Sequence, residues 1–341
     1  MEFGTFLLLQ SPAAEPPEIV YQRGVEITQA AEDLGFNNMW LAEHHFSSYG
    51  YLARPMTYAL HLAHKTRRIR VGTAVIVVPL HHPLVIAEEI ATVDVLSGGR
   101  LDVGLGRGYQ RYEFERLGQD LAESRSRWEE AVDIIMLGLS GETFSYDGKY
   151  FKIPETTVFP QPVQKPTPPI WVTAQSPDSI ETTVRRGFNL LSGGFGVPIE
   201  RLREFRRIFD THMAEHPPKH PIRVGTQRPV YVTDNDADAR AAAEQARWNM
   251  RVTLSLRNNY ERVERGHAQP VPFPNEPSTD DLLEKFSVIG TPDTCIRQLK
   301  RLQDAMHIDH FNCSFSFGAL TQGQVLKSMR MFADEVMPAF R

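Results

Sequence analysis

An acidic residue followed by two histidines is the strongest chemical signal in the sequence. Glu43, His44 and His45 come directly after the apolar segment 38–42, which is predicted to be a strand. Histidine titrates near neutral pH, so an imidazole at a strand end can accept or donate a proton during a reaction. Adjacent side chains point in opposite directions, so one of the two histidines can be a simple packing residue. We expect at least one of them to face an active site.

A second group of residues is suited to binding an anion. Arg107 lies in the run Gly104 to Gly108, where glycines let a ligand approach the backbone. Ser176 and Ser179 follow another predicted strand, and Ser179 lies near a helix start, where free N–H groups and the helix dipole favour an anion. Taken alone, the serines are explained equally well as helix caps. Because the two groups follow neighbouring strands, we predict that they bind a phosphate-bearing cofactor.

Metal binding is the alternative use of the histidines. His61 and His64 are three residues apart on a predicted helix, and His81 and His82 follow a predicted strand. A metal-dependent barrel hydrolase would normally carry His-x-His at the end of its first strand, where this chain has only apolar residues at 6–9. We therefore predict no metal centre, and we interpret His61 and His64 as helix-surface or interface residues.

The elements that must position these residues alternate along the chain. Predicted strands lie at 2–9, 38–42, 69–78, 100–105, 169–174, 189–192, within 222–232 and at 310–317. Predicted helices lie at 16–34, 55–64, 83–96, 124–137, from 175 to 186, and at 199–212, 236–254, 291–306 and 322–340. Strand–helix alternation implies a parallel sheet, and eight such units fit a (β/α)8 TIM barrel with insertions. A doubly wound open sheet is the alternative, but its G-x-G-x-x-G fingerprint is absent.

The barrel interpretation makes residues 1–341 a single domain with two excursions. Residues 141–168 are predicted to be an irregular insertion, and the polar, proline-rich segment 258–279 is a candidate lid loop. In such barrels the active site lies where the strands end. His44, Arg107 and Ser176 all follow predicted strands, so we expect them at the same end of the barrel.

Composition excludes several classes of function. The chain of 341 residues has 37 lysines and arginines against 42 aspartates and glutamates, a formal net charge of −5. No basic stripe is present to neutralise a nucleic acid, and no apolar run approaches the roughly 18–20 residues needed to cross a bilayer. Two cysteines cannot form a disulfide framework, and the N-terminus lacks the basic start of a signal peptide. We expect a cytoplasmic protein with no nucleic-acid or membrane partner.

Short motifs along nearly the whole chain point to one family. They are Met1 to Leu8, Trp40 to Phe46, Val71 to Val75, Ser97 to Arg100, Gly104 to Gly108, Gly290 to Pro292 and Phe332 to Pro338. In order and spacing, these motifs resemble those of the bacterial luciferase-like flavin monooxygenases. The resemblance implies a (β/α)8 barrel that binds reduced FMN supplied by a separate flavin reductase. It also implies that the reduced flavin reacts with O2 to form a C4a-peroxide, which oxidises an organic substrate.

The resemblance also assigns roles to individual residues. His44 matches the catalytic histidine, and Ala74-Val75 matches a pair joined by a cis peptide bond beneath the flavin. The residues that match the cofactor site are Ala74, Val75, Gly106, Arg107, Gln175, Ser176 and Ser179. Gln175 matches an acidic residue whose backbone helps to hold the phosphate. Helices 56–64 and 83–96 match a subunit interface, and the second carries Leu84, Val85, Ile86 and Ile90, so a homodimer is expected.

The substrate site departs from the pattern of luciferase itself. Gly106 replaces a reactive cysteine, residues 192–194 lack an expected tryptophan, and the loop 258–279 matches poorly. We expect these changes to enlarge and reshape the pocket, and we predict a small or medium organic substrate, with an aldehyde or ketone as first choice. Three alternatives stay open: a deazaflavin-dependent oxidoreductase of the same fold, a non-enzymatic flavin-binding protein and, more distantly, a metal-dependent hydrolase.

Overall fold

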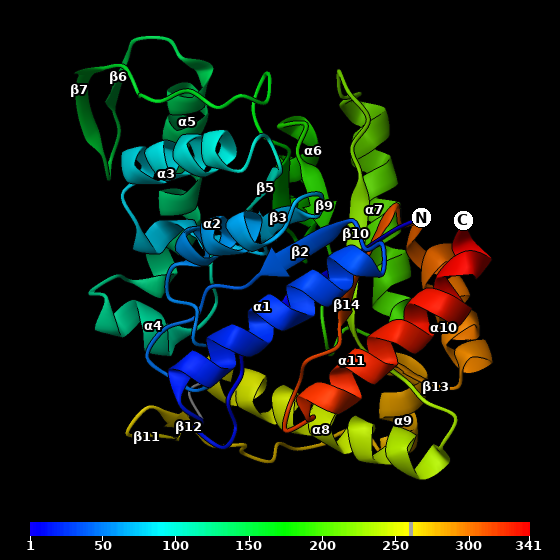
Figure 1. Cartoon of the computed structure of the whole chain (residues 1–341). Helices are drawn as coiled ribbons and strands as arrows, with labels where there is room; N and C mark the ends of the chain where they lie inside the picture. The colour runs from blue at the N-terminus through cyan, green and yellow to red at the C-terminus, as the bar shows by residue number, and fades with distance from the viewer. Residues whose placement is uncertain (259–261) are drawn as a thin grey trace.

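Eight parallel strands close into a barrel surrounded by helices (Figure 1). The computed structural model describes residues 1–258 and 262–341. The ring runs in the order β1 (Glu2–Leu7), β2 (Asn38–Leu41), β3 (Arg70–Thr73), β5 (Leu101–Gly106), β8 (Ile170–Thr173), β9 (Asn189–Leu191), β10 (Val224–Val232) and β14 (His310–Ser314), and β14 pairs with β1. All eight pairings are parallel. The predicted TIM-barrel fold is confirmed, and the open sheet is excluded.

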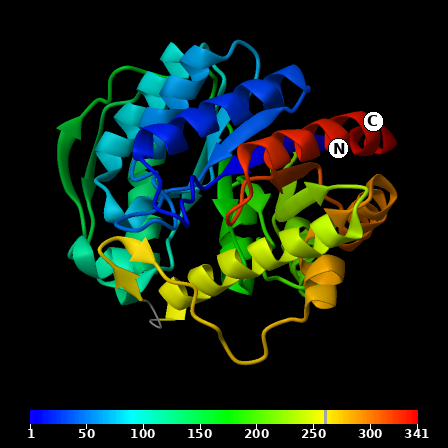
Figure 2. The same ribbon diagram turned by 60° about the horizontal axis from the view of Figure 1, so that its bottom comes forward.

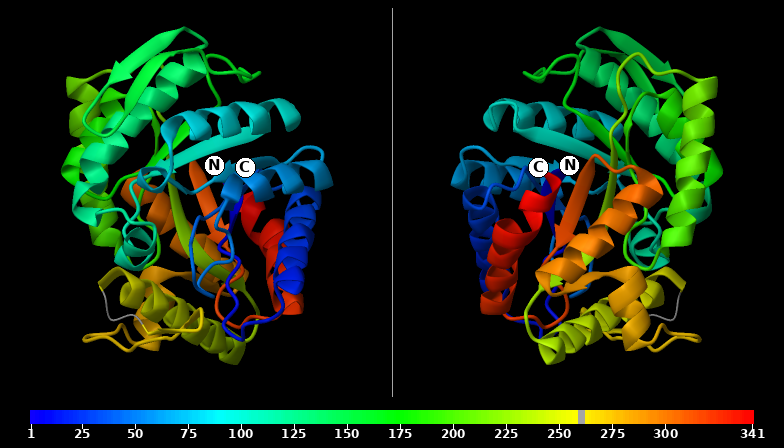
Figure 3. Two further views of the ribbon diagram at one scale, coloured as in Figure 1. Left: turned by 90° about the vertical axis from the view of Figure 1, so that its left-hand side faces the viewer. Right: turned by 90° about the vertical axis from the view of Figure 1, so that its right-hand side faces the viewer.

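The helices lie outside the ring. They are α1 (Pro17–Asp33), α2 (Pro55–Lys65), α3 (Pro83–Leu96), α4 (Arg111–Arg116), α5 (Ser124–Ser140), α6 (Pro177–Arg185), α7 (Ile199–Glu215), α8 (Asp236–Asn258), α10 (Pro292–Met306) and α11 (Gln322–Met331). The chain ends lie side by side (Figure 3), and the N-terminal amine donates to the Phe340 carbonyl at 3.3 Å. Within the described residues, no helix combines the length and apolar character required for a membrane span.

Two buried tryptophans pack against each other inside the barrel. Trp40 and Trp171 are 0% and 1% exposed, and their rings meet edge to face with centroids 5.5 Å apart. Glycine at 72 makes room for them, because a Cβ there would lie 2.7 Å from the Trp40 ring. Trp40 Nε1 also donates to Nε2 of the buried His310 at 3.0 Å. Side chains therefore fill this part of the barrel interior, and a ligand site is expected at the carboxyl ends of the strands.

The segment 69–78, predicted as one strand, is broken in the middle. After β3 the chain bulges at Ala74 and Val75, which are joined by a cis peptide bond, and pairing resumes in β4 (Ile76–Val77) with the register shifted by one residue. The Thr73 hydroxyl bridges the gap by bonding both the N–H and the carbonyl of Gly104, at 2.9 and 3.0 Å. A Cβ at Gly104 would lie 1.9 Å from the Thr73 carbonyl oxygen, so this close approach requires glycine.

The two excursions contain more order than predicted. Residues 141–168 are not simply irregular, because β6 (Phe144–Asp147) and β7 (Lys152–Thr156) pair as an antiparallel hairpin. In the predicted lid, β11 (Val263–Glu264) and β12 (His267–Ala268) also form a hairpin, while residues 259–261 lie outside the described residues. The two hairpins lie at opposite ends of the molecule (Figures 1 and 3).

The carboxyl ends of the strands lie beneath α8 and the β11–β12 hairpin (Figure 2). The hairpin is tied to the loop after β2, since Ser48 N–H donates to the Gly266 carbonyl at 2.6 Å and Ala268 N–H donates to Ser48 Oγ at 3.1 Å. A further strand that sequence patterns did not indicate, β13 (Val288–Gly290), pairs with β10 outside the ring. The loop bearing His44 is therefore covered by the candidate lid.

Candidate active site

His44 is held in one orientation by a buried glutamate. Its Nδ1 lies 2.9 Å from Glu113 Oε1, and the same oxygen accepts the backbone N–H of His45 at 2.9 Å. The two side chains are 9% and 2% exposed. Because a carboxylate oxygen can only accept, Nδ1 carries a hydrogen, and in the neutral imidazole the lone pair is then on Nε2. The arrangement leaves a positioned imidazole nitrogen that can accept a proton.

Two tyrosines surround the His44 ring. The Tyr49 ring meets it edge-on with centroids 4.6 Å apart, and the Tyr109 ring lies 6.3 Å away. The Tyr49 hydroxyl lies 2.9 Å from Thr253 Oγ1 and so links His44 to α8. Burial raises the pKa of both tyrosines above its ordinary value, which keeps their hydroxyls neutral. Tyr109 is still 37% exposed, so the open side of the site lies along its ring.

Ala74, Val75 and Gly106, which form the predicted flavin platform, lie side by side. The cis peptide bond between Ala74 and Val75 is present, as the family resemblance implied. Gly106 lies beside it on β5, and Thr173, an exposed residue at the end of β8, lies close to Gly106. A Cβ on Gly106 would lie 2.2 Å from Val75 Cγ2. Gly106 therefore does not enlarge the pocket as expected, because the Val75 side chain occupies that space.

Gly106→Ala should destabilise the protein, because its new methyl group collides with Val75. Overpacking of this kind costs about 1–3 kcal/mol of the free energy of unfolding. The double variant Gly106→Ala/Val75→Ala should recover most of that loss, since the second substitution removes the colliding methyl groups. Urea denaturation of the four proteins in this double-mutant cycle measures the coupling. Strictly additive effects would show that the two side chains do not compete for the same space.

Three arginines gather at the predicted phosphate site. Burial lowers the pKa of Arg107, and so does the positive charge of Arg125 and Arg257 nearby. Arg125 Nη1 also lies 3.7 Å from Asp178 Oδ2 in the first turn of α6, which places Arg125 at the start of that helix. Sequence reasoning missed Arg125 and Arg257, because only the fold brings α5 and α8 to this place. The concentration of positive charge beside a helix N-terminus favours an anion.

Ser176 and Ser179 form a capping box at the start of α6. The Ser176 N–H donates to Ser179 Oγ at 3.0 Å, the Ser179 N–H donates to Ser176 Oγ at 3.4 Å, and Ser179 Oγ donates to the Ser176 carbonyl at 2.8 Å. Gln175 precedes the cap and is exposed. The capping role that the sequence left open is therefore present. A contact of Gln175, Ser176 or Ser179 with a phosphate stays a prediction.

Two groups of histidines bear on the metal alternative, an exposed pair on α2 and a largely buried cluster around Glu43. His61 stacks on Tyr58 with centroids 5.9 Å apart, and both His61 and His64 are exposed on α2, as predicted. Ligand-type atoms of Glu43, His45 and His81 lie within 4.8 Å of one another. Hydrogen bonds between these side chains account for that closeness, so the prediction of no metal centre stands as a prediction.

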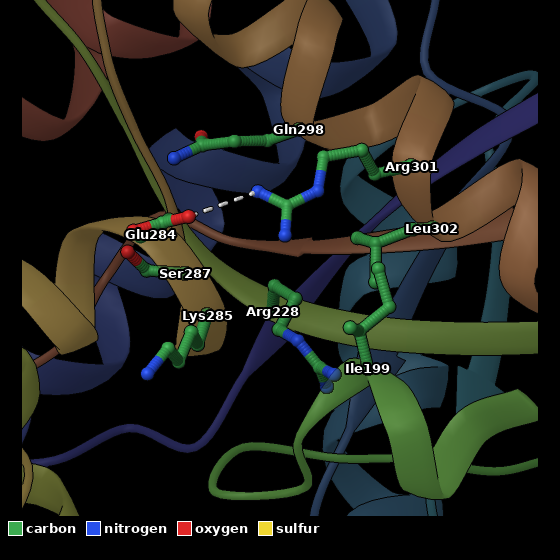
Figure 4. Close-up of a pocket in the computed structure, with 8 residues that line it drawn as sticks. All are labelled: Ile199, Arg228, Glu284, Lys285, Ser287, Gln298, Arg301 and Leu302. Carbon is green, nitrogen blue, oxygen red and sulfur yellow. Dashed lines mark ion pairs between the residues drawn. The ribbon is translucent and has the colours of Figure 1, made fainter.

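A small cavity lies away from this site, between β10 and helices α7 and α10 (Figure 4). Burial lowers the pKa of Arg228 to about 10, and its guanidinium donates to the carbonyls of Gly194 and Val197 at 2.9 and 2.7 Å. Across the cavity, Arg301 pairs with Glu284 at 3.7 Å. The volume of about 10 Å³ is room for one water molecule. Arg228 therefore fixes the loop after β9 and does not form a substrate site.

Comparison with known proteins places the chain in a family. A family model described as luciferase-like monooxygenase matches residues 1–307. The chain is 29% identical to the oxygenase component of a flavin-dependent trigonelline monooxygenase from Acinetobacter baylyi, covering 100% of this chain and 96% of that protein. It is 27% identical to the alkanal monooxygenase alpha chain of the Kryptophanaron alfredi symbiont, covering 99% and 97%.

Solved structures share the fold over the whole chain. Monooxygenase RslO1 from Streptomyces bottropensis gives a TM-score of 0.89 at 24% identity and covers 100% of both chains. The FMN complex of the oxygenating constituent of 3,6-diketocamphane monooxygenase from Pseudomonas putida gives 0.82 at 18% identity, covering 99% and 98%. An F420-dependent secondary alcohol dehydrogenase gives 0.77 at 20% identity, covering 100% and 99%. With a family model that spans most of its length, this chain belongs to the luciferase-like monooxygenase family.

Proposed function

We propose that this protein is the oxygenase component of a two-component, FMNH2-dependent monooxygenase that oxidises a small or medium organic substrate, with an aldehyde or ketone as first choice. The observation that carries this proposal is the His44–Glu113 pair, which leaves His44 Nε2 free to accept a proton. Bound reduced FMN would supply the oxygen chemistry. The chain's own part is to hold the cofactor, to move a proton at His44 and to exclude water beneath α8 and the β11–β12 hairpin.

A separate flavin reductase as partner is supported by one relative. The trigonelline enzyme from Acinetobacter baylyi is described as an oxygenase component, which implies a second protein that supplies the reduced flavin. The direct test is aerobic turnover with FMN, NADH and a generic flavin reductase against a panel of aldehydes and ketones. Substrate-dependent product with oxygen consumption supports the proposal. Oxygen consumption that yields only hydrogen peroxide across the whole panel counts against this substrate class.

A deazaflavin-dependent oxidoreductase is the second candidate, because an F420-dependent alcohol dehydrogenase shares the fold. The two cofactors differ in what they can do, since a deazaflavin transfers hydride without oxygen. Parallel titrations of the purified protein with FMN and with F420 distinguish them. Tighter binding of F420, together with alcohol oxidation in the absence of oxygen, would overturn the monooxygenase proposal.

Arg107→Ala should weaken FMN binding by roughly ten- to a hundredfold. The substitution removes a charge-assisted contact to the phosphate, which contributes about 1.5–3 kcal/mol. Arg107 lies with Arg125 and Arg257 in the arginine cluster, which is predicted to bind the phosphate. Riboflavin has no phosphate, so its affinity should change little in the same variant. Fluorescence titration of both ligands gives the two dissociation constants. Equal losses for FMN and riboflavin would place the phosphate elsewhere.

A homodimer is expected from the outer face of α3. Val85, Val95 and Leu96 are 42%, 40% and 62% exposed on this helix, and contact with a second copy of the chain would bury these apolar side chains. Ile86 and Ile90, counted on this face from the sequence, belong instead to the core at 2% and 0% exposure. Light scattering at micromolar concentration should report twice the mass of the chain, and Leu96→Glu should shift the protein toward monomer. A monomeric wild-type protein would contradict this expectation.

A further inference from the structure

One buried carboxylate joins three segments around the candidate site. The Glu43 side chain is 0% exposed, and its Oε1 accepts from His45 Nε2 at 2.8 Å and from His81 Nε2 at 2.6 Å. Its Oε2 accepts the backbone N–H of Val77 at 2.8 Å. Glu43 therefore connects the loop that carries His44, the strand β4 that resumes after the cis peptide bond, and the segment that leads into α3.

The partners of His81 define its protonation state. Arg54 Nη1 lies 2.9 Å from His81 Nδ1, and Arg54 pairs with Glu89 at 3.0 Å on the surface. A guanidinium can only donate, so Nδ1 must be unprotonated and Nε2 must carry the hydrogen that Glu43 accepts. Coordination of a metal through Nε2 would need a hydrogen on Nδ1, which would then meet the Arg54 N–H, so this cluster is built for hydrogen bonding.

The surroundings of His45 favour its positively charged form. Burial opposes its charge, but the hydrogen bond from Glu43 and the charges of Glu43 and Glu113 outweigh burial and the repulsion by Arg54, and they raise the pKa of His45 above 6.5. Although burial raises the pKa of Glu43, its hydrogen bonds with His45 and His81 lower it to about 2 overall. These contacts favour the charged forms of Glu43 and His45, and His81 is the third member of the hydrogen-bond network.

Glu43 and His45 flank His44 in the sequence, so the hydrogen bonds of this network hold the loop that carries His44. We propose that Glu43 is a positioning residue that locks the His44 loop to the strand after the cis peptide bond, and that the charge on His45 makes this lock sensitive to pH. His45 also donates its backbone N–H to Glu113, the residue that orients the His44 ring. Loosening the Glu43 contacts would therefore move both the His44 loop and the flavin platform. The link to flavin binding rests on the proposed function.

The direction of the pH dependence follows from the charged partner. A histidine whose pKa is raised in the folded state adds stability that is fully present below its unfolded-state pKa and is lost as the pH rises through the folded-state value. Wild-type melting temperature and FMN affinity should therefore both decline as the pH rises above about 6.5. In Glu43→Gln the charge that holds the proton on His45 is gone, so the same transition should move to lower pH.

The test compares two buried glutamates. Glu130, in α5, is 9% exposed and accepts backbone N–H groups of Lys149, Tyr150 and Phe151, which connect β6 to β7. Glu130→Gln is thus a matched control for the loss of a buried carboxylate. Melting temperature and the dissociation constant of reduced FMN, titrated in the absence of oxygen, are measured from pH 6 to pH 9 for wild type and both variants.

Both variants should melt at a lower temperature than wild type, but only Glu43→Gln should weaken FMN binding, by about tenfold, and shift the pH transition. Wild-type FMN affinity and pH profile in Glu43→Gln, or the same change in Glu130→Gln, would overturn the proposal. If Glu43→Gln does not fold, His81→Leu and His81→Gln decide the question. His81→Gln keeps a donor for Glu43 and should retain FMN affinity that His81→Leu loses, and equal behaviour of the two would overturn the proposal.

Failure of the proposed function gives a different result. If wild type does not bind FMN at any pH, the cofactor assignment fails. The melting temperatures still test the ion pair, because the shift of the pH transition in Glu43→Gln needs no flavin.

Discussion

His44→Ala should lower product formation by about 10²–10⁴-fold, the usual contribution of a positioned acid–base group. In wild type, Glu113 fixes the ring through Nδ1 and leaves Nε2 to accept a proton. Without the imidazole, oxygen consumption should continue while electrons are diverted to hydrogen peroxide. FMN affinity should change little, because the predicted phosphate contacts come from α6 and the arginine cluster. The measurements are product yield, peroxide yield and FMN titration on one purified variant.

Thermal melting separates this role from simple packing. The His44 ring touches Tyr49 and is nearly buried, so its removal has some structural cost in either case. A packing role predicts a less stable variant that keeps the coupling of oxygen consumption to product. A folded, FMN-binding His44→Ala protein with full coupled turnover would refute the catalytic assignment, and His45 would become the next candidate.

The barrel was predictable from local patterns alone. Apolar segments such as 100–105 and amphipathic segments such as 291–306 match their elements closely, because periodicity reports which face of a strand or helix is buried. The break inside 69–78 was not predictable from periodicity. It arises from contacts across strands, where the Thr73 hydroxyl replaces backbone pairing to Gly104, and a continuous apolar run carries no sign of such a bulge.

The candidate site was predictable in part for the same reason. His44 and Arg107 follow strands, and the strand-end rule finds them. Glu113 was missed because it lies in α4, a short helix without a clear pattern, and meets His44 only through the fold. The error at Gly106 has a similar origin. The free space beside a glycine depends on the size of the neighbouring side chain. Val75 becomes the neighbour of Gly106 only when β4 pairs with β5.

Glu113→Gln should reduce coupled product formation by about a hundredfold, while melting temperature and FMN affinity stay close to wild type. The amide oxygen of glutamine can still accept from His44 Nδ1 and from the His45 N–H, so the geometry is retained. What is lost is the negative charge that stabilises the imidazolium formed when His44 takes up a proton, and partners that orient a functional histidine are typically worth 10–100-fold or more in activity. Glu115→Gln, an exposed change on the same helix, is the matched control and should behave as wild type.

Glu113→Ala should instead lose stability as well, because two buried donors are left without an acceptor, at about 1–3 kcal/mol each. If Glu113→Gln turned over with wild-type yield, the carboxylate would be a structural support for the loop, and His44 would act without help from its charge.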